Sequence, residues 1–167
     1  MKINRRFSGI LLLVSLVSIS VMGMAGIEKK SGQNLIVVPS RHTVVQLAFD
    51  IAKIRPVDIV AYDRVPKTGK MVLFTWSKQQ HDWMSTSMEE FGAAAMLQEI
   101  PGRVILIGGE RDLPSSVISA SSWCPDQITI PTLDMLTLVN SLDHIFDFSS
   151  REWTWLAKEH QLELKDL

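Results

Sequence analysis

The sequence predicts an α/β domain of three layers, a Rossmann-like arrangement in which a mostly parallel sheet of about five strands has helices on both faces. Short runs of Val, Ile and Leu alternate with segments in which apolar residues recur at helical spacing. Nearly continuous apolar strands of this kind are typical of a sheet that is covered on both faces. With 46% hydrophobic and 21% charged residues, the chain can bury a core, and composition excludes a disordered, collagen-like or multi-span membrane protein.

The elements follow one another in a regular order. They are expected as a strand at 35–38, a helix at 44–54, strands at 57–62 and 71–76, a helix at 80–98, a strand at 103–107, a short helix from 114, a strand at 127–130, and helices from 132 and from 149. The chain has 167 residues, which fits a single domain over residues 35–167, preceded by a polar linker over residues 26–34.

The first half contains a strand, a helix and two further strands. The first strand stops at Pro39, and the helix must end before Pro56, because a residue that precedes proline disfavours the helical conformation. Only the turn-rich residues 64–70 join the next two strands, which is too short for a crossover helix. The third strand is therefore either antiparallel to the second or its neighbour across an irregular turn.

The second half begins with the helix at 80–98, which is expected because Met84, Met88 and Phe91 share one helical face. The strand at 103–107 is the clearest in the chain. Pro114 is tolerated in the first turn of a helix, and Thr132 can cap the helix that follows Pro131.

The terminal helix has a recognisable start. Ser149 and Glu152 have the spacing of a capping box, and the tryptophans at 153 and 155 follow within the first turns. We therefore expect the domain to end in a helix that bears tryptophans.

The N-terminal segment has the layout of a secretory signal peptide. Lys2, Arg5 and Arg6 form a basic region, and the next 21 residues are uncharged and end in small side chains. We assign residues 1–25 to the signal peptide and expect an extracytoplasmic protein, periplasmic or secreted. The alternative is an uncleaved anchor that holds the domain outside the membrane, because 21 uncharged residues could just span a bilayer.

Charge and cysteine content narrow the function classes. Three of the 17 basic residues lie in the leader, so the mature chain has 14 basic against 18 acidic residues. A sequence-independent nucleic-acid binder carries the opposite balance, so we expect no nucleic-acid partner. The single cysteine, Cys124, cannot form an intramolecular disulfide, and a buried, unreactive thiol is favoured over a nucleophile.

The residues that follow the predicted strands are polar. In an open parallel sheet, ligands bind beyond the carboxyl ends of the strands, where loops and helix N-termini converge. We therefore expect one polar rim there, with two glycines that allow a close backbone approach to a ligand. Its ligand-binding candidates are Arg41, Asp63, Gly108, Gly109, Glu110 and Arg111. An antiparallel third strand would move residues 77–82 to the opposite edge.

Histidines and carboxylates in these loops are the candidates for catalysis. A general base needs a histidine that a carboxylate orients beside a nucleophile. The candidates are His81, Asp82, His42, Glu110 and Asp112. The sequence contains no G-x-S-x-G elbow, and a surface histidine at a helix start explains His81 more simply. It also lacks H-x-x-x-H and C-x-x-C pairs, so we expect no metal and no cofactor.

Two segments carry a family resemblance. Residues 104–109, a hydrophobic strand that ends in Gly-Gly, and residues 39–48, with Arg41 at a helix start, resemble the cell wall-binding repeats of secreted bacterial proteins. The resemblance implies an α/β module that attaches to an envelope polymer, with Arg41, Gly108 and Gly109 at matching positions. The chain departs from the family at residues 78–83.

These features predict an exported, non-enzymatic binding domain of the bacterial cell envelope, whose ligand is an envelope glycan or an envelope protein. We expect membrane contact only through an uncleaved N-terminal segment. The alternative is a small extracytoplasmic hydrolase or transferase that uses a His/carboxylate pair. Convergence of His81 and Asp82 with Ser40, Glu110 or Asp112 in a concave pocket would favour the enzyme, and their dispersal would favour binding.

Overall fold

The structure, a computed structural model, describes residues 31–109 and 111–162. The predicted signal peptide and its cleavage site lie outside the described residues. The elements are β1 (Ser31–Pro39), α1 (His42–Ala52), β2 (Val57–Arg64), β3 (Met71–Ser77), β4 (Asp82–Thr86), α2 (Met88–Gly92), β5 (Pro101–Ile107), α3 (Ser115–Ala120), β6 (Gln127–Ile130), α4 (Met135–Phe146) and α5 (Ser150–Glu159). Among the described residues, no helix is both long enough and apolar enough to span a bilayer.

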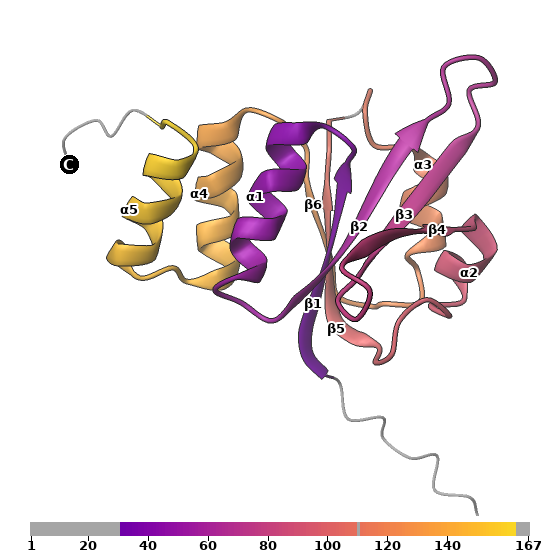
Figure 1. Ribbon diagram of the computed structural model, residues 1–167, viewed down its shortest axis with the longest axis horizontal. Coiled ribbons are helices and arrows are strands. Elements are labelled where there is room, and N and C mark those ends of the chain that lie inside the picture. Colours follow the sequence, from indigo (N-terminus) through magenta and orange to yellow (C-terminus); the bar gives the residue numbers. More distant parts are fainter. Residues whose placement is uncertain (1–30, 110, 163–167) are drawn as a thin grey trace, which may run out of the picture.

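One mixed sheet organises the described part of the chain, and its strand order is β4-β3-β2-β1-β5-β6 (Figure 1). The pairs β1–β2, β1–β5 and β5–β6 are parallel, whereas β3 runs antiparallel to both β2 and β4. The predicted α/β class with a mostly parallel sheet is confirmed. The third strand takes the antiparallel orientation that the short 64–70 connection allowed.

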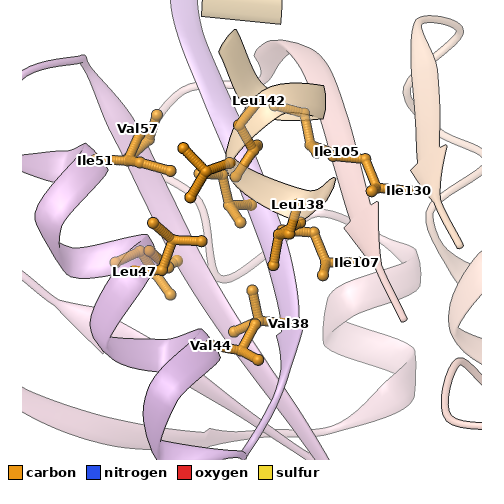
Figure 2. Close-up of a cluster of buried hydrophobic side chains, with 14 of the residues drawn as sticks. Val38, Val44, Leu47, Ile51, Val57, Ile105, Ile107, Ile130, Leu138 and Leu142 are labelled. Atoms are coloured by element: carbon orange, nitrogen blue, oxygen red, sulfur yellow. The ribbon is translucent and has the colours of Figure 1, made fainter. Parts of the chain in front are cut away.

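Helices α1, α4 and α5 lie on one face of the sheet, and the core beneath them is purely aliphatic at its centre (Figure 2). Helix α1 contributes Val44, Leu47 and Ile51, which recur every three to four residues and are at most 2% exposed. They pack against side chains from β1, β2, β5 and β6, and Leu138 and Leu142 of α4 close the cluster.

The opposite face is covered by α2 and α3. In β1, Leu35 and Val37 point to this face while Ile36 and Val38 point to the other, as the two-residue period of a strand requires. Phe91 of α2 is fully buried here and meets Trp123 edge-on. Both faces of β1 are therefore buried, which explains its unbroken apolar sequence.

The helix predicted at 80–98 is wrong. Residues 82–86 instead form β4, which pairs with β3 and places Trp83 opposite Trp76. His81 has a φ of 52° in the turn between the two strands. Only Met88–Gly92 is helical, and Ser87 begins that short helix with a capping box to Glu90. Cross-strand packing thus overrides the helical spacing of Met84, Met88 and Phe91, and the sheet has six strands rather than about five.

Several element boundaries also differ from the predictions. β1 begins at Ser31, inside the segment expected to be a linker. The N-cap of α4 is Asp134, whose carboxylate accepts the Thr137 N–H, while Thr132 accepts the Asp134 N–H instead of capping the helix. The capping box that was predicted between Ser149 and Glu152 is confirmed.

Arg55 joins the end of α1 to the connection between α4 and α5. Its guanidinium forms a bidentate pair with Glu152, at 2.7 and 3.0 Å. It also donates to the carbonyl oxygens of Ile54, Phe146 and Asp147, at 2.9 to 3.2 Å. Because one side chain satisfies three backbone carbonyls and a carboxylate, it fixes how α5 sits beside α1.

Acid is expected to weaken this connection. The Arg55 guanidinium, together with the N–H and hydroxyl groups of Ser149, lowers the pKa of Glu152 from its ordinary 4.5 to about 2. A carboxylate with a lowered folded-state pKa contributes stability that is complete above pH 4.5 and is lost as the pH falls toward about 2. We expect the Tm of the wild type to fall through this window more steeply than that of Glu152→Gln.

Thermal unfolding followed by circular dichroism at several acidic pH values checks this expectation. Cap hydrogen bonds also lower the pKa values of Glu90 and Asp134, so both proteins retain a shared acid sensitivity. The difference between the two slopes of Tm against pH therefore reports the contribution of Glu152. Equal slopes would show that the Arg55–Glu152 pair adds no stability in the folded protein.

Candidate functional site

The carboxyl edge of the sheet holds the point where the strand order reverses. From β1 the chain continues to β2, which lies on one side of β1 in the sheet, and it later returns to β5 on the other side. The carboxyl ends of β1 and β5 therefore flank this point. Arg41, which follows β1, donates to the Asp112 carboxylate, which follows β5, at 2.5 Å. The structure therefore brings together two of the predicted site residues, and their ion pair lies at the switch in strand order, the place where such folds bind ligands.

Below this ion pair, Tyr62 and Gly108 form a tight contact. The Tyr62 hydroxyl donates to the Ile107 carbonyl oxygen at 2.8 Å and is buried. Burial, reinforced by the nearby Asp112 carboxylate, raises the pKa of Tyr62 well above its ordinary value, so the phenol stays protonated. Gly108 has a φ of +149°, and a Cβ there would collide with the Tyr62 hydroxyl. Packing at this point thus requires glycine. The presence of Gly108 is therefore explained without a role in ligand binding.

The other predicted rim residues lie near the same edge without joining one cluster. Asp63 is exposed near the end of β2, where its carboxylate accepts the Arg64 N–H at 2.7 Å. Arg111 is exposed in the turn after β5. The Gly109 carbonyl accepts the N–H groups of Asp112 and Leu113 at 2.9 Å and so closes that turn. Glu110 lies outside the described residues.

His81 and Asp82 lie at the opposite edge of the sheet. Because β3 is antiparallel, the turn before β4 is level with the amino end of β2, where Lys78 pairs with Asp58 at 2.8 Å. The Asp82 carboxylate accepts the Trp83 N–H at 2.7 Å and is thereby committed to the backbone. An antiparallel third strand was expected to move residues 77–82 to this edge, and His81 and Asp82 accordingly do not converge with Ser40 or Asp112.

His42 lies in a different setting, at the mouth of a groove between α1 and the β3–β4 hairpin. We call it the aromatic groove, and its lining residues are Ser40, His42, Val45, Ala61, Phe74 and Trp83. Its volume is about 420 Å³. Ser40 and His42 are exposed at the rim end, while the walls are apolar. An apolar concavity with few polar groups at its mouth is the usual form of a binding site.

A cluster of three rings holds the wall of the aromatic groove in place. Phe49 of α1 meets Trp76 and Trp83 edge-on, with ring centroids 4.9 and 5.7 Å apart, and the two indoles are 5.4 Å from each other. All three rings are only partly buried. The Trp83 indole therefore has a fixed orientation and still offers surface to a ligand.

Sequence reasoning missed this groove because it placed Trp83 in a helix. The alternation of Phe74 and Trp76 on one face of the third strand was the available signal. A hairpin across residues 78–81 would have carried Trp83 to the same face.

Among residues 31–109 and 111–162, no group of three or more His, Cys, Asp or Glu side chains is placed to hold a metal ion. Cys124 is buried, with its sulfur 3.5 Å from the Asp126 carbonyl oxygen, as expected for an unreactive thiol.

Fold and site together describe an α/β domain with an open aromatic groove beside a polar strand edge. No family model, curated protein or solved structure matches the chain, so the resemblance to cell wall-binding repeats stays a prediction.

Proposed function

We propose that the chain is an exported, non-enzymatic binding domain of the bacterial cell envelope, with a three-layer, Rossmann-like fold. Its ligand is an envelope glycan or an envelope protein. The observation that carries this proposal is the aromatic groove, an open apolar concavity of about 420 Å³ that ends in Ser40 and His42 at the carboxyl edge of the sheet.

The ring cluster suits binding for a physical reason. An indole that two neighbouring rings already orient loses little conformational freedom when a ligand covers it. Sugar rings and apolar side chains both stack on such a surface, and aromatic residues dominate the energetics of many interfaces. The hydroxyl of Ser40 and the imidazole of His42 can then supply directional hydrogen bonds at the mouth.

The arrangement of the titratable groups favours binding over the hydrolase or transferase alternative. Catalysis demands a base, its orienting carboxylate and a nucleophile within hydrogen-bond reach of one another. Here the carboxylate of Asp82 bonds the backbone, that of Asp112 pairs with Arg41, and His42 and His81 are at opposite ends of the sheet.

Trp83→Ala is expected to weaken binding to envelope material about tenfold, the loss typical of a central aromatic contact. The measurement is co-sedimentation of the mature protein with purified peptidoglycan sacculi and, separately, with an envelope protein fraction. The soluble phase is assayed for released product.

Trp155→Ala is the matched control, since it removes an indole that sits on α5, near Lys53 and away from the aromatic groove. Its binding should equal that of the wild type, provided that both variants unfold cooperatively. Retention in neither fraction would contradict the proposal. Release of soluble product that depends on His42 or His81 would establish the enzyme instead.

A further inference from the structure

β4 is one of the two edge strands of the sheet (Figure 1). Residues of this strand line two cavities, one on each face of the sheet. Trp83 belongs to the aromatic groove on the α1 side. Met84 and Thr86, which point to the other side, line a second cavity of about 720 Å³. Both hollows therefore flank the same strand, which has a sheet neighbour on one side only.

The second cavity, which we call the acidic cavity, has a net negative lining. Its charged residues are Asp58, Lys78, Glu90 and Glu99. Lys78 pairs with Asp58 at 2.8 Å, which leaves an excess of two carboxylates. Met84, which is 47% exposed, Met96 and Leu97 supply an apolar patch among them. Such a lining suits a lysine or arginine, whose methylenes cover the methionines while its cationic head meets the carboxylates.

The backbone of β4 offers hydrogen-bonding groups at the open edge. In an antiparallel pair, alternate residues direct their N–H and C=O groups toward the neighbour and away from it. The Trp83 N–H is bonded to the Asp82 side chain, which marks Trp83 as a residue whose backbone faces away from β3. Ser85, two residues on, has the same orientation and can pair with an added strand.

We propose that β4 binds an extended polypeptide segment as an additional strand of the sheet, with basic side chains entering the acidic cavity and the alternate apolar side chains entering the aromatic groove. Main-chain hydrogen bonds to the edge give affinity, and the two cavities select alternate side chains. The inference rests on the proposed function and commits its ligand to a protein of the envelope in place of a glycan.

The charges favour a basic foreign segment over a second copy of this chain. β4 itself contains Asp82 and no basic residue. Pairing two copies through β4 would therefore bring further negative charge to the acidic cavity without a compensating cation.

The test uses a fluorescein-labelled seven-residue peptide in which Lys and Val alternate, with fluorescence anisotropy as the readout. A peptide with Glu in place of Lys should bind at least about tenfold more weakly, and binding of the Lys peptide should weaken as ionic strength rises to about 0.15 M. Ser85→Pro removes the outward donor and should weaken binding about tenfold.

Glu99→Lys tests the acidic cavity without touching the edge, and a loss of about threefold to tenfold is expected. Glu159→Lys is its matched control, since it reverses an exposed carboxylate at the far end of α5 and should leave binding unchanged. Glu99 is exposed, so this variant remains informative even where Ser85→Pro fails to fold.

Equal binding of the Lys and Glu peptides, or binding that survives both Ser85→Pro and Glu99→Lys, would overturn the inference. So would a concentration-dependent dimer in sedimentation velocity that Ser85→Pro abolishes, because β4 would then hold a second copy. If the protein is retained on protein-free sacculi and Ser85→Pro is retained equally well, the inference is overturned while the proposed function stands. Peptide binding without retention on any envelope fraction overturns the proposed function alone.

Discussion

Replacing Gly108 with alanine is expected to lower the free energy of unfolding by about 3 kcal/mol, through overpacking and backbone strain together. The new methyl group would collide with the Tyr62 hydroxyl and lie 3.1 Å from the Leu113 Cβ, while alanine would have to adopt a φ of +149°. Tyr62 cannot retreat easily, since its hydroxyl is buried and bonded to the Ile107 carbonyl oxygen. Urea unfolding of the two proteins measures the difference.

Two variants separate this explanation from a general intolerance of the loop. Gly109→Ala places a methyl group 3.5 Å from the Asp112 carboxylate and 3.8 Å from the Pro131 carbonyl oxygen, which are ordinary contacts, so its effect should stay within about 0.5 kcal/mol. Adding Tyr62→Phe to Gly108→Ala removes the colliding oxygen and should recover part of the loss. A double variant less stable than the sum of its single changes would refute the proposed collision.

Arg55→Met is expected to lower the free energy of unfolding by about 2 kcal/mol, because it leaves several polar partners without their donor. The variant removes both bonds to Glu152 and the donors to the carbonyl oxygens of Phe146 and Asp147, while keeping an unbranched apolar side chain. Urea unfolding again provides the measurement. Arg55→Lys keeps the charge but not the planar fork, so an intermediate loss is expected.

Arg41→Met is the control for Arg55→Met. The Arg41 side chain is 58% exposed and pairs with a single carboxylate oxygen of Asp112, whereas that of Arg55 is 22% exposed. Solvent screens the exposed pair, so its loss should cost less than about 0.5 kcal/mol. Similar losses in the two variants would mean that the extra carbonyl contacts of Arg55 add nothing.

Sequence predicts well those parts of the fold whose secondary structure depends on their own residues and not on a distant partner. β1 and β5 are buried on both faces, so every residue from Leu35 to Val38 must be apolar whatever surrounds it. The Ser149 capping box depends on two residues in one turn and is likewise readable.

The hairpin of β3 and β4 escapes such reasoning because its pairing partner decides its structure. The spacing of Met84, Met88 and Phe91 fits a helix. In the structure, however, Trp83 lies in a strand and packs against Trp76 and Phe49. The same misassignment hid the aromatic groove, since its outer wall is Trp83. The meeting of Arg41 with Asp112 was accessible from sequence because parallel strands bring their carboxyl ends to one edge.

The place of β1 in the sheet bears on when the chain can fold. This strand precedes every other described element in the sequence, yet it lies between β2 and β5 and needs both to bury its edges. Its second neighbour is synthesised only after the whole β2–β4 unit and α2. Such long-range pairing is slow to form. We therefore expect β1 to lack its second neighbour until most of the chain has been made. The export that we propose would require a chain that has not yet folded.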